Sequence, residues 1–329
     1  MSESSTTPPQ TSRFAQLEHF PVAFFAMIMG TTGLTLAWQK AAHVLHMPLF
    51  ISHLLLLLVA LLFTTVIAAY SYKYINFRGA VLAEFQHPIK ISFFPAGSIA
   101  LLLLSVATLQ VAPTLSHLLW LIGAPLQLTL TLYVIGQWIF HPKYQIQHST
   151  PAWFIPVVGN IVVPIAGVEH GYTELSWFFF AIGVVYWLVL KTLIFNRVLF
   201  HDPLPEKLLP TLFILIAPPA VGFLAYMKLN GGELDTFARI LYYAAMFLVL
   251  LLASQAKRFS RIQFYLSWWA YSFPLAAATL ASMVMYSKTS HSGLLTLSYL
   301  MLTATTVIIG LLLIRTSRTV ISGKVFQPD

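Results

Sequence analysis

The sequence predicts an all-α integral membrane protein with ten transmembrane helices, arranged as five helical hairpins. Three observations lead to this fold class. First, 58% of the 329 residues are hydrophobic and only 9% are charged, whereas an average soluble domain has about 25% charged residues. Second, the apolar residues fall into ten segments of roughly the length that crosses a bilayer. Third, residues that break helices recur in alternate segments.

Short connections separate the ten segments, so we expect consecutive helices to pack as antiparallel hairpins. Segment boundaries predicted from sequence shift by a few residues. In chain order the segments cover residues 20–43, 49–75, 91–111, 115–140, 152–169, 173–199, 209–229, 233–257, 265–287 and 291–316.

The lysines and arginines predict the orientation in the membrane. With the N-terminus placed inside, fourteen basic residues lie on the inner side and four lie on the outer side, namely Lys40, Lys228, Arg239 and Lys288. Basic residues near helix ends favour the cytoplasmic side. An even number of crossings returns the chain to that side, so we expect both termini to be cytoplasmic.

Helix breakers are concentrated near the middles of the odd-numbered segments, whereas most even-numbered segments are smoother. In a membrane, irregular backbone is tolerated where protein or water satisfies it. We therefore expect the odd helices to form an inner ring around a central pore, with the even helices outside. The alternative is that these residues only permit close helix packing. The pore-lining candidates drawn from the pattern are Gly30, Gly33, Phe94, Pro95, Gly97, Pro156, Gly159, Asn160, Pro218, Pro219, Gly222 and Pro274.

The uncharged stretch from Trp268 to Met283 holds an aromatic residue, Phe273, directly before Pro274. A proline inside a helix removes a backbone donor and clashes with the preceding turn, so we expect a kink here. The freed carbonyl would need protein or water as a partner. A kinked packing helix is the simpler alternative to a pore.

The segment from Glu84 to Lys90 joins the second and third apolar segments and mixes charged residues with Phe85 and Pro88. It fits an interfacial loop at the lipid headgroups. It also fits a cytoplasmic vestibule in which Lys90 collects anions near Glu84.

Charged residues are nearly absent from the interiors of the apolar segments, and charge there marks proton relays and cation sites. This argues against a cation channel, because such channels commonly use rings of acidic residues. A neutral conduit with a positive cytoplasmic rim suits anions. The chain has no cysteine, and no histidine pair has metal-site spacing with a carboxylate nearby. No nucleotide-binding or catalytic motif is present. We expect no catalytic residues, metal site or cofactor, and no nucleic-acid partner.

Four separated motifs resemble the tellurite-resistance and C4-dicarboxylate transporter family, whose members include bacterial tellurite-resistance proteins and the slow anion channels of plant guard cells. The motifs are Ala-Glu-Phe-Gln-His-Pro-Ile-Lys-Ile-Ser-Phe (83–93), Trp-Phe-Ile-Pro-Val-Val-Gly-Asn (153–160), Ala-Pro-Pro-Ala (217–220) with Ala225-Tyr226, and Trp-Trp-Ala-Tyr-Ser-Phe-Pro (268–274). The resemblance extends over all ten segments.

The resemblance implies a homotrimer in which each protomer has its own pore, formed by five hairpins with the odd helices inside. It implies that Phe273 in the ninth helix closes a pore that is selective for small monovalent anions. The implied location is the bacterial inner membrane, with the lipid bilayer and small inorganic anions as partners. The alternative function is a proton-coupled secondary exporter of tellurite, sulfite or C4-dicarboxylates, in which His53 or Glu84 would be the titratable residue.

These expectations divide the chain into three parts. Residues 1–17 form a cytoplasmic N-terminal tail, which we expect to be disordered because its first part is rich in Ser, Thr, Pro and Gln. Residues 18–316 form the ten-helix transmembrane channel domain. Residues 317–329 form a cytoplasmic C-terminal tail.

Overall fold

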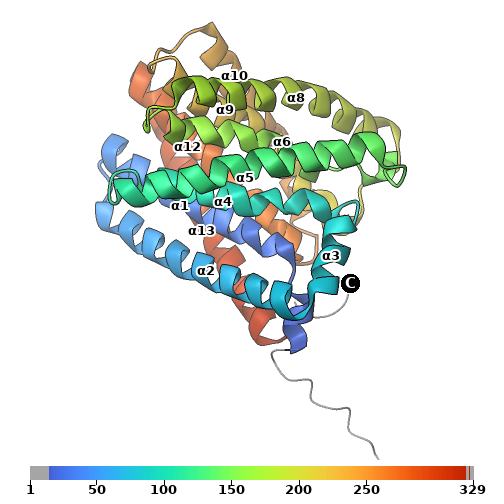
Figure 1. Ribbon diagram of the computed structural model, residues 1–329. Helices are drawn as coiled ribbons and strands as arrows, with labels where there is room; N and C mark the ends of the chain where they lie inside the picture. Colours follow the sequence, from blue (N-terminus) through green and yellow to red (C-terminus); the bar gives the residue numbers. More distant parts are fainter. Residues whose placement is uncertain (1–14, 324–325, 327–329) are drawn as a thin grey trace, which may run out of the picture.

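The computed structural model of the protein describes residues 15–323 and 326, and in this part of the chain all regular elements are helices, without a β-strand. The long helices lie side by side in one bundle, as Figure 1 shows. The α-helices are α1 (Phe25–Val44), α2 (Leu49–Asn76), α3 (Arg78–Gln86), α4 (Pro95–Thr108), α5 (Pro113–Phe140), α6 (Phe154–Val158), α7 (Val163–Gly167), α8 (Thr173–Phe200), α9 (Ala217–Leu229), α10 (Thr236–Ala253), α11 (Ala256–Phe259), α12 (Ser272–Thr289) and α13 (Ser292–Ile321).

Short 3-10 helices precede several of these α-helices. They are η1 (Ala15–His19), η2 (Val22–Phe24), η3 (Lys90–Phe93), η4 (Ile146–His148), η5 (Pro151–Trp153), η6 (Gly159–Val162), η7 (Glu206–Ile216) and η8 (Leu266–Tyr271).

Eight helical stretches in the described residues are long and apolar enough to cross a membrane, which agrees with the prediction of an all-α membrane protein. The two predicted segments outside this set are the fifth and the ninth. The fifth, Pro151–Gly167, is shorter. The ninth joins η8 to α12 and is rich in Ala, Ser, Thr and aromatic residues.

Burial separates the odd-numbered segments from the even-numbered ones. In Val22–Val44, Lys90–Thr108 and Glu206–Leu229, 72%, 72% and 78% of the most apolar stretch is buried. In the five even-numbered spans the buried share is only 17% to 39%. On α2, for example, Leu54 and Leu61 are each 60% exposed. A helix with large exposed aliphatic side chains is suited to lipid contact.

The buried segments contact one another in a closed order. α1 packs on α4, α4 packs on η6 and α7, these pack on α9, α9 packs on α12, and α12 packs back on α1. Each of them also packs on the long helix that follows it in the chain: α1 on α2, α4 on α5, α7 on α8, α9 on α10, and α12 on α13.

The prolines of the odd segments lie at breaks between two kinds of helix, and not within one long α-helix. In four of the segments a 3-10 helix leads into an α-helix, and the proline lies in the first turn after the junction: Pro95 in α4, Pro164 in α7, Pro218 in α9 and Pro274 in α12. In the first turn of an α-helix the missing N–H has no intrahelical partner to lose. These prolines therefore mark where tight winding changes to α-helix.

The two glycines of α1 do not break that helix either, because α1 is continuous from Phe25 to Val44. A Cβ atom added at Gly30 would lie 1.9 Å from Ser272 Oγ, and one added at Gly33 would lie 2.9 Å from Ala276 Cβ. Glycine at these positions therefore lets α12 pack closely against α1, as small residues do between membrane helices.

Two segment boundaries differ from the prediction. The connection predicted as a loop around residues 84–90 begins as a helix, α3, which lies at one end of α2 (Figure 1). The last helix, α13, continues to Ile321, beyond the predicted boundary at 316. Most of the predicted N-terminal tail, residues 1–14, lies outside the described residues, and so do 324–325 and 327–329.

Candidate functional site

A cavity of about 590 Å³, which we call the Phe273 cavity, is lined from all five odd-numbered segments. Its lining positions lie in the N-terminal parts of those segments, together with α3 and the turn that follows it. Along the chain they fall within residues 21–29, 84–99, 154–162, 207–221 and 265–274.

A second cavity of about 700 Å³, which we call the lysine cavity, is lined from the same five segments. Here the lining positions lie in the C-terminal parts of the segments and in the connections that follow them. They fall within residues 36–43, 106–110, 165–169, 224–232 and 280–288.

The two cavities follow one another along the bundle. On each of the five segments, the second lining starts three to seven positions after the last residue of the first. An α-helix rises 1.5 Å per residue, so the separation is about 5–10 Å. Among the residues that line either cavity, none comes from α2, α5, α8, α10 or α13. The buried segments thus enclose two hollows with a short closed stretch between them.

Phe273 lies at the boundary between the two hollows. It is the second residue of α12, half-buried, and it lines the Phe273 cavity. Its ring packs against α1, because a Cβ atom added at Gly33 would lie 3.3 Å from Phe273 Cδ2. Gly33 belongs to the part of α1 between the two linings. The ring therefore stands at the side of the Phe273 cavity that faces the closed stretch.

The structure brings six of the predicted site residues together around the Phe273 cavity. These are Glu84, Lys90, Gly159, Pro218, Phe273 and Pro274. The other predicted lining residues line neither cavity and pack between helices instead. These are Gly30, Gly33, Phe94, Pro95, Gly97, Pro156, Asn160, Pro219 and Gly222.

Two of the residues outside the lining have defined structural contacts. Phe94 packs edge-on against Phe85 and Tyr70, with ring centroids 4.7 Å and 6.3 Å away. Asn160 is fully buried and donates hydrogen bonds to Thr131 Oγ1 at 2.9 Å and to the Val157 carbonyl at 2.7 Å. Both side chains therefore stabilise packing between segments.

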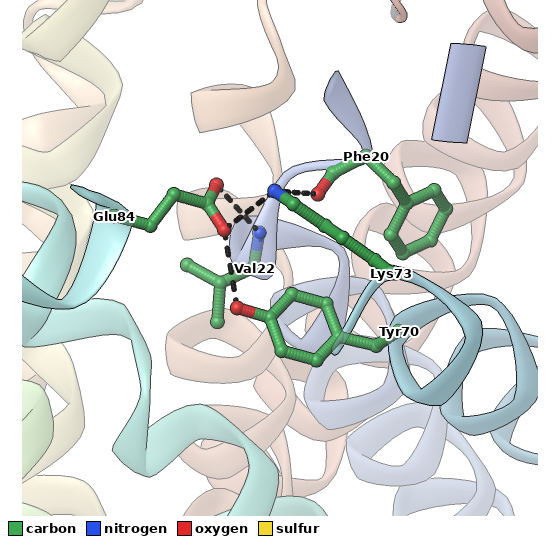
Figure 2. Close-up of polar contacts among 5 residues, drawn as sticks. All are labelled: Phe20, Val22, Tyr70, Lys73 and Glu84. Carbon is green, nitrogen blue, oxygen red and sulfur yellow. Dashed lines mark hydrogen bonds and ion pairs between the residues drawn. The ribbon is translucent and has the colours of Figure 1, made fainter. Parts of the chain in front are cut away.

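Glu84, predicted for an open vestibule, is buried in an ion pair. Figure 2 shows Lys73 of α2 donating to Glu84 Oε2 at 2.8 Å and to the Phe20 carbonyl at 2.9 Å. The Tyr70 hydroxyl donates to the same carboxylate at 3.1 Å, and the Val22 amide donates to Oε1 at 3.4 Å. Only 2% of Lys73 and 8% of Glu84 are exposed. The pair joins α2, α3 and the entry to α1 at the rim of the Phe273 cavity.

A histidine pair lies beside the lysine cavity. His117 and His170 have ring centroids 4.9 Å apart, and each also contacts a hydroxyl: Ser116 Oγ is 3.0 Å from His170 Nε2, and Tyr172 OH is 3.1 Å from His117 Nε2. Burial lowers the pKa of His170, His117 lowers it further, and Glu169 opposes the shift. Glu169 itself lines the lysine cavity.

Lys40, Lys228 and Lys288 of the lysine cavity were not among the predicted site residues. A signal for them was present in the sequence, since they are three of the four basic residues assigned to the outer side. Lys73 was also missed, because a lysine near a helix end is ordinarily read as interfacial. Within the described residues no three His, Asp or Glu side chains come together, so no residue set is assigned to a metal or cofactor.

The sequence is similar to those of known anion channels. A sequence model of the SLAC1 family, described as voltage-dependent anion channel, matches residues 19–317. The S-type anion channel SLAH3 of Arabidopsis thaliana is 32% identical over 281 residues, which are 83% of this chain and 44% of SLAH3. The guard cell S-type anion channel SLAC1 of the same plant is 26% identical over 89% of this chain and 55% of its own length.

A microbial relative matches over a larger share of its own length. The tellurite resistance protein TehA homolog of Haemophilus influenzae is 23% identical over 93% of this chain and 92% of that protein. By contrast, this chain spans about half the length of SLAH3 and of SLAC1.

Proposed function

The chain belongs to the SLAC1 family of voltage-dependent anion channels, and we propose that it conducts small monovalent anions through a pore that joins the two cavities. The observation that carries this proposal is the shared lining. The same five segments enclose both cavities in the same order along each segment. Two unrelated packing defects would have no reason to use the same five segments and to avoid the five exposed helices.

The chemistry of the lining supports an anion as the conducted species. Glu84 and Glu169 are the acidic residues among the lining positions, and each is paired with a lysine, Lys73 and Lys228 respectively. Two further lysines, Lys90 and Lys207, also line the Phe273 cavity. Basic side chains at the mouth of a weakly polar passage favour an anion over a cation.

We assign the gate to Phe273. An aromatic ring in a narrow, weakly polar passage obstructs a hydrated ion. The ring lies beside the closed stretch between the cavities and packs against Gly33 of α1, which has no side chain to fix the ring in place. Rotation of this side chain would connect the two hollows.

The wider architecture of the proposal is the one the sequence predicts. Residues 18–316 form ten crossings in five hairpins, with the odd helices around the pore. In this proposal Pro151–Gly167 and residues 266–289, which lie outside the eight stretches long and apolar enough to cross, are the remaining two crossings. We further propose a homotrimer in the bacterial inner membrane, with residues 1–17 and 317–329 in the cytoplasm.

The test of the gate is the substitution Phe273→Ala. We expect it to raise anion conductance in liposomes or oocytes roughly tenfold or more, because removal of the ring opens the closed stretch. The matched control is Phe94→Ala, which removes the same ring from a position outside both cavities. Equal conductance in Phe273→Ala and the wild type, at equal insertion, would contradict the assignment.

Reversal potentials separate a channel from a coupled exporter. A channel follows the anion gradient alone, whereas proton coupling adds a term that moves with the pH gradient. The structure gives little support to the coupled alternative, since Glu84 is held by Lys73 and His53 lies exposed on α2, outside both linings.

A further inference from the structure

The lysine cavity brings three basic side chains from three different segments to one hollow. Lys40 comes from α1, Lys228 from α9 and Lys288 from α12. Glu169 is the acidic residue in the lining, and it pairs with Lys228 at the exposed rim. Within the described part of the chain, neither Lys40 nor Lys288 forms an ion pair.

The three lysines line one hollow, and Lys40 is half-buried. The ammonium group of Lys288 lies over the backbone of Gly232, since a Cβ atom added there would be 3.2 Å from its Nζ. Gly232 has φ +83°, a conformation that favours glycine. The turn after α9 therefore leaves room for the ammonium group at the cavity wall.

Like charges that converge in a partly enclosed space repel one another unless an anion lies between them. The distribution of basic residues along the chain also argues that these three lysines meet here for a functional reason. In the predicted topology only four basic residues lie on the outer side, and three of them meet in this cavity. Chance placement under the positive-inside bias would scatter them.

We propose that the lysine cavity is an anion-binding site, in which Lys40 and Lys288 hold a small inorganic anion and Lys228 lies at the rim. The cavity, at about 700 Å³, has room for an anion that keeps part of its water shell. A divalent oxyanion such as sulfate binds more tightly than a monovalent anion, because both of its charges interact with the lysines. This inference rests on the proposed function in one respect only: it takes the monovalent anions that bind in the lysine cavity to be the ones that the pore conducts.

Binding is tested directly with sulfate on the purified full chain in detergent. Sodium sulfate is exchanged for sodium gluconate at constant ionic strength, and the thermal unfolding midpoint is measured. A ligand that binds the folded state raises the midpoint, here by about 2 °C or more in the wild type. In the double variant Lys40→Gln/Lys288→Gln the rise is lost.

Two further variants sharpen this measurement. Lys257→Gln removes the same charge from α11, outside the cavity, and is expected to keep the full rise. Glu169→Gln removes the carboxylate of the lining and is expected to give a larger rise in the thermal unfolding midpoint. The proposal is overturned if wild type shows no rise, or if the double variant shows the same rise as wild type.

Conduction supplies the second measurement, made in a Phe273→Ala background so that current is large. At about 20 mM chloride, Lys40→Gln/Lys288→Gln is expected to lower the current roughly threefold to tenfold, and at about 0.5 M the difference disappears because salt screens the lysines. Unchanged current at low salt overturns the collecting role while leaving the conduit intact. Sulfate binding without any current in this background overturns the conduit and supports the binding site.

Discussion

The two ends of the hollow region treat charge in opposite ways. At the Phe273 cavity, which Lys90 and Lys207 also line, the one acidic lining residue is neutralised inside the protein, since Glu84 lies 2.8 Å from Lys73 and both are buried. At the lysine cavity three lysines line one hollow, and its one carboxylate, Glu169, is exposed and pairs with Lys228. Burial of a charge is costly unless a partner and hydrogen bonds compensate it, whereas a charge beside open water has no such requirement.

The difference indicates separate roles for the two sets of charges. The buried pair holds the Phe20 carbonyl and the Val22 amide, and so fixes the start of η2 and α1 against α2 and α3 (Figure 2). Val22 lines the Phe273 cavity. We therefore expect the pair to stabilise the fold around that cavity, and the lysines to act on solutes while contributing little to stability.

The largest effect is expected when one partner of the buried pair is removed. Glu84→Gln keeps the shape of the side chain but leaves the Lys73 ammonium buried and unpaired, so we expect a loss of about 3–5 kcal/mol in the free energy of unfolding. Lys288→Gln, on the exposed side, is expected to change it by less than about 0.5 kcal/mol. Reversible unfolding in denaturant measures both.

A third variant tests whether the loss of stability comes from leaving one buried charge without its partner. In Lys73→Met/Glu84→Leu both charges are gone, and we expect a smaller loss than in Glu84→Gln alone. Similar losses in Glu84→Gln and Lys288→Gln would show that the two ends do not differ in the way described here.

The closed stretch between the cavities depends on close packing of α1 against α12. Gly30→Ala places a Cβ atom 1.9 Å from Ser272 Oγ, so overpacking is expected to cost about 1–3 kcal/mol. Gly136→Ala is the matched control, because nothing lies within 4 Å of its Cβ position in α5, and the same change there is expected to be neutral or mildly stabilising. Equal stability of the two variants would mean that α12 moves freely away from α1.

The smallest expected effect concerns pH at the lysine-cavity end. Because the pKa of His170 is lowered from 6.5 in the folded protein, folding favours its neutral form. The stability it contributes is complete above pH 6.5 and is lost as the pH falls through the lowered pKa. The thermal midpoint of wild type should therefore fall more steeply below pH 6.5 than that of His170→Asn. Parallel pH profiles would contradict this account.

Much of the fold could be predicted from the sequence because membrane helices are recognised by their apolar composition and their length. The all-α fold and the family were predicted and are confirmed. The local role of the prolines was not predictable, because a proline at the centre of an apolar run fits both a kink and the first turn after a 3-10 helix. Pro95 and Pro274 lie in the first turn of an α-helix that follows a 3-10 helix.

The site was predictable only in part, for a physical reason. Breaker residues mark segments that pack closely, and close packing places glycines such as Gly30 and Gly33 against a neighbouring helix as readily as beside a hollow. The partner of Glu84 lies on another helix, and the lysine cavity depends on three segments far apart in sequence. Residue spacing and composition do not show which side chains from distant segments meet in the folded protein.

Thiol accessibility tests whether the two cavities form one conduit closed at Phe273, and the absence of cysteine in the chain is an advantage for this measurement. Val284→Cys places a single thiol in the lysine cavity. A small anionic thiol reagent is applied from the Phe273 side alone, with Phe or Ala at position 273, and labelling is followed in time. The account predicts labelling at least about tenfold faster with Ala than with Phe. Equal rates in the two backgrounds, or no labelling in either while a reagent from the other side labels both, would contradict it.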